Sequence, residues 1–113
     1  MAFEDVELVT LDQAKVHAGI TDSDRDEDLT LKLEEAHALV LDYISRPDDD
    51  WTAEMEAWDG DTAPRAVRAA VMRQFADLVR FRGDDDDAAK VNGYDLSPAV
   101  AQLLRRYRDP ALA

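Results

Sequence analysis

Cysteine is absent from this 113-residue chain, and aromatic residues make up only 7% of it. Without cysteine the chain has no disulfide framework and no thiolate ligand for a metal ion. With so few aromatic residues, a hydrophobic core has to come mainly from Leu, Val, Ile and Ala, within the 46% of residues that are hydrophobic. The length suits one domain, which we expect to span residues 1–113.

Several functional signals are absent as well. No apolar run approaches the ~20 residues of a membrane-spanning helix, and the first residues lack the basic and apolar regions of an export signal. Glycine-rich phosphate loops, nucleophile elbows and the H-E-x-x-H zinc pattern do not occur. His17 and His37 lie on different predicted helices and favour no zinc site. We therefore predict no catalytic residue, no cofactor, no metal and no membrane partner.

Acidic residues at alternate positions from Asp22 to Asp28 resemble the start of a calcium loop. An EF-hand loop also needs glycine at its sixth position and a bidentate Glu at its twelfth. Here Glu27 and Leu33 occupy those two positions. We expect this stretch to place negative charge at a helix N-terminus, where the helix dipole favours it.

Acidic residues are abundant and unevenly distributed. The net charge is −13, but residues 1–61 hold 19 acids and 4 bases, a net −15, whereas residues 62–113 hold 7 acids and 9 bases, a net +2. The acidic half opposes binding to nucleic acid phosphates. Two interpretations remain open: the excess acid only keeps a small protein soluble, or the molecule is polarised for contacts between its two ends.

Helix signals predict an all-α, small four-helix bundle-like domain, with two long and two short helices and acidic loops. The first short helix begins at the capping box of Thr10 and Gln13 and ends before Gly19. The first long helix ends at about Ser45, before Pro47. We expect Glu54 to Glu56 to add at most one helical turn.

The second long helix is expected from Ala63, capped by Thr62, to about Arg82, with Gln74 at the margin of its buried stripe. The last helix begins after Ser97, with Pro98 at its first position. Its inner face would carry Val100, Leu103, Leu104 and Tyr107. The predicted shared core consists of Leu29, Leu33, Val40, Ile44, Val67, Val71, Phe75, Leu78, Val100 and Leu104.

Two sets of residues are candidates for subunit contacts. Leu31 and Leu41 fall off the core stripe, so they are either ordinary exposed leucines or a second contact face. Arg65, Arg73 and Arg80 share one side of their helix, where they would form ion pairs or, less favourably, bind phosphate. Arg105 and Arg106 of the last helix are further interface candidates.

The order of the segments resembles that of the small head–tail connector proteins of long-tailed bacteriophages and prophages, also called head completion or adaptor proteins. The resemblance rests on residues 9–15, the acidic turn at 21–28, the helix ending at residues 40–47, the Pro-led helix with Val67 and Phe75, and the closing stretch 96–108. It covers nearly the whole chain.

The resemblance implies a structural protein that forms a homo-oligomeric ring below the portal protein. Such a ring extends the DNA channel and docks the tail-completion or stopper protein. The expected location is the virion head–tail interface, after assembly in the host cytoplasm. DNA would pass through without tight binding, past an acidic wall formed by Asp48, Asp49 and Asp50 or by Asp84, Asp85, Asp86 and Asp87.

Two other functions compete with this one. An acidic DNA mimic that inhibits a DNA-binding partner would explain the charge, but it requires carboxylates spaced along one exposed face. The acids here gather at helix starts and loops instead. A metal-dependent enzyme has no specific motif in its favour.

Overall fold

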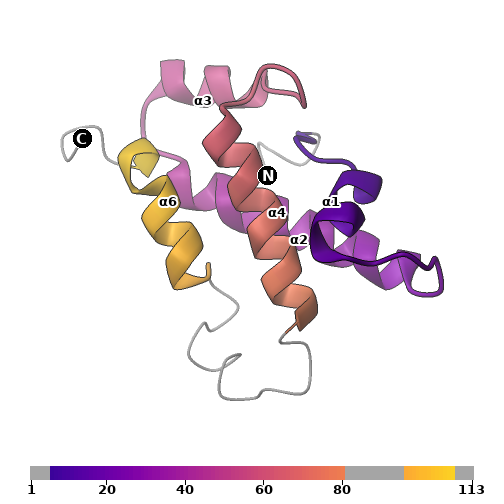
Figure 1. Cartoon of the computed structure of the whole chain (residues 1–113). Helices are drawn as coiled ribbons and strands as arrows, with labels where there is room; N and C mark the ends of the chain where they lie inside the picture. Colours follow the sequence, from indigo (N-terminus) through magenta and orange to yellow (C-terminus); the bar gives the residue numbers. More distant parts are fainter. Residues whose placement is uncertain (1–5, 81–95, 109–113) are drawn as a thin grey trace.

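The chain folds into α-helices, as the sequence predicts. The computed structural model describes residues 6–80 and 96–108, and over these ranges it contains five helices and no strand (Figure 1). They are α1 (Leu11–Ala18), α2 (Asp26–Ile44), α3 (Asp49–Glu56), α4 (Arg65–Arg80) and α6 (Pro98–Arg108). The predicted number of four is therefore too low, because the acidic insert after α2, residues 48–61, contains a helix of its own.

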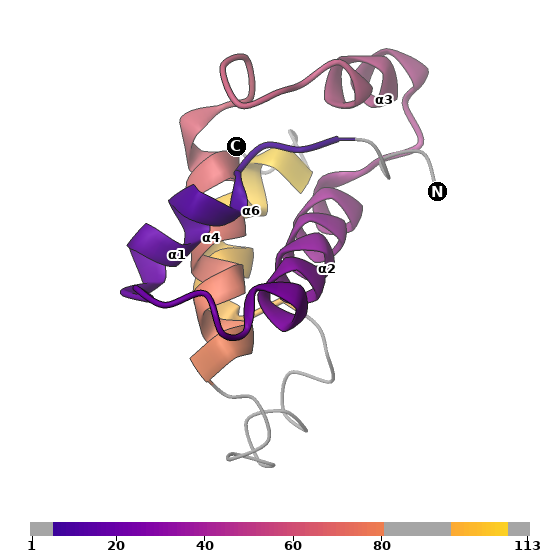
Figure 2. The same ribbon diagram turned by 90° about the vertical axis from the view of Figure 1, so that its right-hand side faces the viewer.

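Helix α4 occupies the centre of the molecule. Figure 1 shows α6 on one side of α4, α1 on the opposite side and α2 crossing behind it. Both α1 and α6 pack against α4 and α2. Helix α3 lies at the end of the molecule where α2 finishes and α4 begins (Figure 2). The arrangement leaves α1 and α6 as opposite flanks of the fold.

One hydrophobic cluster joins all five helices and the extended segment before α1. Nine of the ten predicted core residues are buried in it, and Leu78 packs against it while partly exposed. Besides alanines, the additions to the predicted core are Val6, Leu8, Val9, Leu41, Met55 and Trp58. Most of these lie in segments that the sequence presented as connections.

The first helix follows its sequence signals closely. The Thr10 hydroxyl accepts a hydrogen bond from the Gln13 backbone N–H at 3.2 Å, and the Gln13 side chain accepts one from the Thr10 N–H at 3.0 Å. Gly19 ends the helix with φ of 75°, in the left-handed region that favours glycine. The predicted capping box and helix end are confirmed.

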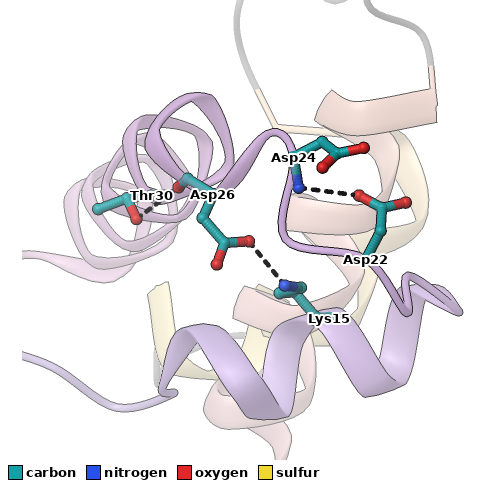
Figure 3. Close-up of polar contacts among 5 residues, drawn as sticks. All are labelled: Lys15, Asp22, Asp24, Asp26 and Thr30. Carbon is teal, nitrogen blue, oxygen red and sulfur yellow. Dashed lines mark hydrogen bonds and ion pairs between the residues drawn. The ribbon is translucent and has the colours of Figure 1, made fainter.

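The acidic turn between α1 and α2 is held by its own polar contacts (Figure 3). Lys15 Nζ pairs with the Asp26 carboxylate at 2.6 Å, and the Thr30 hydroxyl donates to the Asp26 carbonyl at 2.8 Å. The Asp22 carboxylate accepts from the Asp24 backbone N–H at 3.2 Å. No acid caps α2, because Arg25 occupies the N-cap position without a side-chain hydrogen bond. The acids still lie in the first turn, as expected from the helix dipole.

Helix α3 begins where three aspartates follow one another. The Asp48 carboxylate accepts from the Trp51 backbone N–H at 3.1 Å, and Asp49 and Asp50 lie in the first turn. An N-cap aspartate followed by acidic residues is a helix start. The acidic composition had favoured a polar loop with at most one turn of helix, and that prediction was wrong.

The two tryptophans fix α3 to the end of α2. Trp51 Nε1 donates to the Ile44 carbonyl at 2.8 Å, which satisfies a backbone acceptor at the C-terminus of α2. Trp51 also meets Trp58 edge to face, with ring centroids 5.5 Å apart, and Arg46 lies over its ring at 4.1 Å. The insert is thus packed structure rather than a solvated loop.

The start of α4 differs from the prediction. Thr62 does not cap the helix; its hydroxyl accepts from the Asp59 backbone N–H at 3.0 Å in the preceding turn. The Pro64 carbonyl accepts the first helical hydrogen bonds, from Val67 and Arg68. The polar groups of turn residues 59–62 form hydrogen bonds with one another instead of capping the helix, which begins at Arg65.

Gln74 and Ser97 join α4 to α6 through a buried contact. The Gln74 side-chain oxygen accepts from the Ser97 backbone N–H at 2.9 Å, and both residues are buried. The amphipathic pattern had placed Gln74 at the edge of the buried face. It lies inside because the N-terminus of α6 supplies a donor that a buried amide oxygen needs.

His37 is buried in the middle of α2, with 7% of its surface exposed. Its Nε2 lies 2.9 Å from the Leu8 backbone nitrogen and 3.2 Å from that of Val9, while its Nδ1 lies 3.0 Å from the Leu33 carbonyl. Backbone N–H groups only donate and carbonyls only accept, so Nδ1 carries the proton and Nε2 accepts. His37 therefore ties the extended segment before α1 to α2.

Candidate functional site

A groove lies between α1 and α4 on one flank of the molecule. It has a volume of about 450 Å³ and is lined by Asp12, Gln13, Val16, His17 and Met72. Val16 is 80% exposed, the highest value among the large hydrophobic residues that the structure describes as exposed. The α1 residues that face the core, such as Ala14, leave Val16 pointing away from it. The groove thus offers an apolar wall with one carboxylate at its edge.

The outer face of α6 lies on the opposite flank. Leu103 is 42% exposed there, and Arg105 and Arg106 are exposed. Val100 and Leu104 face the core, as predicted, but Leu103 does not. The prediction placed Leu103 on the inner face together with Val100, Leu104 and Tyr107. Among the described helices α6 packs mainly against α4 and α2, so its buried face is narrow. α6 contains no acidic residue.

The three predicted interface arginines of α4 are exposed, as an interface would require. Arg73 forms an ion pair with the nearly buried Asp77 at 3.4 Å, one helical turn away. Part of the charge of Arg73 is therefore matched within its own helix. The interface role of Arg65, Arg73 and Arg80 stays a prediction.

The two leucines that were expected to face water differ. Leu31 is 64% exposed, as predicted, whereas Leu41 is completely buried. The expected exposure of Leu41 was wrong. Helices α1, α4 and α6 all pack against α2, and together these neighbours cover the side of α2 that carries Leu41. Leu41 belongs to the core and not to a contact face.

The predicted channel-facing acids fall into two groups. Asp48, Asp49 and Asp50 are exposed at the start of α3, at one end of the molecule. The run from Asp84 to Asp87 lies outside the described residues. Only the first group can therefore be located among the described residues.

A second, polar groove of about 440 Å³ lies beside the extended segment before α1 and the turn at 59–61. Arg68 Nε lies 3.4 Å from the Leu8 carbonyl, to which it donates. Hydrogen bonds from the Asp61 and Thr62 backbone and from the Thr62 hydroxyl lower the pKa of Asp59. These groups bond to one another, so we assign them to the turn and not to a ligand.

Within residues 6–80 and 96–108, no group of three acidic or histidine side chains is placed to hold a metal ion. His17 and His37 lie on α1 and α2, as expected. Over the same residues, no helix has the length and apolar character needed to cross a membrane.

The decisive comparison is with protein families. Residues 8–108 match the family model described as phage gp6-like head-tail connector protein. The chain belongs to this head–tail connector family. The resemblance seen in the sequence is thereby confirmed, over all of the described helices. Neither a curated protein nor a solved structure shows a significant match to the chain.

Membership in the connector family gives the protein a structural role in a phage particle. It implies a location at the head–tail junction and contacts with other head and tail proteins. The family is not known for enzyme activity. The surfaces on the two flanks are then candidates for protein contacts. The sequence analysis did not predict the groove. The one signal for it in the sequence is Val16, an apolar residue that lies outside the apolar face of α1 formed by Leu11, Ala14 and Ala18.

Proposed function

We propose that this connector forms a homo-oligomeric ring below the portal protein of a phage or prophage particle. The ring extends the DNA channel and docks the tail-completion or stopper protein. The match to the connector family over residues 8–108 carries this proposal. Residues 1–113 act as one domain that joins the virion at the head–tail interface, after assembly in the host cytoplasm.

The charge distribution supports a ring. A closed ring needs two different surfaces on each subunit, each meeting the next copy. Residues 1–61 carry a net −15 and residues 62–113 a net +2, which suits contacts between unlike ends. Leu31, Arg65, Arg73 and Arg80 are exposed and stay among our proposed interface residues.

DNA is proposed to pass through the ring without tight binding. Asp48 to Asp50 cluster at one exposed corner of the fold, at the start of α3. Facing the channel, these carboxylates would repel the phosphates and keep the wall from gripping the DNA. Asp84 to Asp87 would serve the same purpose.

Deletion of the gene from the phage or prophage tests the proposed function. Because the proposed ring links the portal protein to the tail, we expect heads and tails that do not join in its absence, and recovery of infectious particles when the gene is supplied on a plasmid. Electron microscopy of the lysate distinguishes the products. Tailed, infectious particles from the deletion strain would refute the proposal.

A further inference from the structure

We propose that the outer face of α6 of one copy docks into the α1–α4 groove of the next copy. The outer face is defined by Leu103 and Arg106, which lie three residues apart on one side of the helix, and the groove by Asp12, Gln13, Val16, His17 and Met72. The inference rests on the proposed ring and names the two surfaces that would build it. Leu103 would lie against Val16 and Met72.

The position of the two surfaces favours a repeating contact. α1 and α6 both pack on α4 but on opposite sides of it (Figure 1). When two copies join through these flanks, each still presents one unused surface, so a third copy adds in the same way. A contact between unlike surfaces generates a ring when the rotation from one copy to the next closes on itself.

The apolar parts of the two surfaces correspond. The large hydrophobic residues exposed in the described ranges are Val16, Leu31 and Leu103, and two of these three lie on the proposed surfaces. The groove is an open depression of about 450 Å³, which leaves room for a leucine side chain to lie against Val16 and Met72. Burial of Val16 and Leu103 against each other would remove both from water.

The charges correspond too. Among the residues that line the groove, Asp12 supplies a carboxylate and none is a lysine or an arginine. α6 holds three arginines and no acid, and the exposed Arg106 lies three residues after Leu103, on the same side of the helix. Exposed ion pairs contribute only about 0–1 kcal/mol each, so they orient the contact and the apolar residues hold it.

Disulfide cross-linking tests the contact directly, because the chain has no cysteine of its own. In the double variant Val16→Cys/Leu103→Cys, every copy carries both halves of the contact. Mild oxidation of the concentrated protein should give a ladder of dimers, trimers and larger species. An equimolar mixture of the two single variants should give mainly the mixed dimer and stop there, because each copy carries only one half.

The matched control is Ala53→Cys/Leu103→Cys, which pairs the same α6 position with an exposed residue of α3. It should give no ladder. Absence of a ladder from Val16→Cys/Leu103→Cys, or an equal ladder from the control, would overturn the docking. Dimers of Val16→Cys alone that form as readily as the mixed dimer would also overturn it, since they would show a contact between like surfaces.

Charge insertion provides a second test without cysteine. Val16→Glu and Leu103→Glu lie at exposed positions, so helix content by circular dichroism should stay unchanged. Each should lose the ring mass in native mass spectrometry, whereas Ala53→Glu should keep it. Rings that persist in both variants would refute these surfaces and leave the proposed function intact. Failure of the proposed function would appear separately, as infectious particles from the deletion strain.

Discussion

Replacement of His37 tests the best-defined buried polar contact in the fold. His37 Nε2 accepts hydrogen bonds from the Leu8 and Val9 backbone nitrogens at 2.9 and 3.2 Å. In His37→Phe the ring remains but the acceptor is lost. The Leu33 carbonyl loses only a second partner, because it also accepts the helical bond within α2. The cost therefore comes mainly from two buried donors before α1.

A buried polar group left without a partner costs about 1–3 kcal/mol. The N–H groups of Leu8 and Val9 share one acceptor, His37 Nε2. Loss of that acceptor therefore costs less free energy than the loss of two separate hydrogen bonds. We expect His37→Phe to lower the free energy of unfolding by about 2–4 kcal/mol. His37→Gln places an amide oxygen near the position of Nε2 and should cost less than half as much.

The same contact makes stability depend on pH. Burial is the main cause that lowers the pKa of His37 below its ordinary 6.5, while the hydrogen bond to Leu33 and the charge of Glu7 oppose it. The folded state therefore resists protonation. The contribution of His37 to the free energy of unfolding is fully present above pH 6.5. It decreases as the pH falls toward the lowered pKa of the folded state, by at most about 1.4 kcal/mol per pH unit. His37→Gln should remove this part of the slope.

Urea unfolding followed by tryptophan fluorescence measures both effects, since Trp51 and Trp58 are packed at the end of α2. Measurements at pH 7.5 and 5.5 compare the wild type with the two His37 variants. His17→Gln is the control, because His17 is exposed on α1. A loss below about 0.5 kcal/mol for His37→Phe, or an unchanged pH slope in His37→Gln, would refute the role assigned to His37.

Three further predictions concern the core, the insert and DNA. Leu33→Ala should lower the free energy of unfolding by about 2–5 kcal/mol, because Leu33 is buried in the central cluster; a loss below about 1 kcal/mol would show loose packing there. Trp51→Phe should cost about 1 kcal/mol in the same assay, because it removes the hydrogen bond to the Ile44 carbonyl; no loss would mean that this bond adds nothing. The isolated protein should not shift double-stranded DNA in a gel near physiological salt, because its net charge is −13; a salt-sensitive shift would identify the arginines as a phosphate-binding face.

Local signals in the sequence were sufficient to predict those features that depend on residues close together in the chain. The capping box of Thr10 and Gln13, the helix end at Gly19 and Pro98 at the first position of α6 all appear as predicted. Hydrophobic spacing of 3–4 residues identified nine buried core positions, because the helical period sets which side chains share a face. The order of these segments was also enough to suggest the family.

Only the tertiary structure decided which residues at the edges of the apolar helix faces are buried. Leu41 and Gln74 are buried because neighbouring helices cover them, and Gln74 finds a donor at Ser97, 23 residues away. Leu103 faces outward because α6 packs over a narrow face. The α1–α4 groove exists because two helices that are far apart in the sequence, with residues 19–64 between them, lie side by side, and no local pattern contains that information. The spacing of apolar residues determines which side of each helix is apolar, but the neighbouring helices that pack on that side determine how much of it is buried.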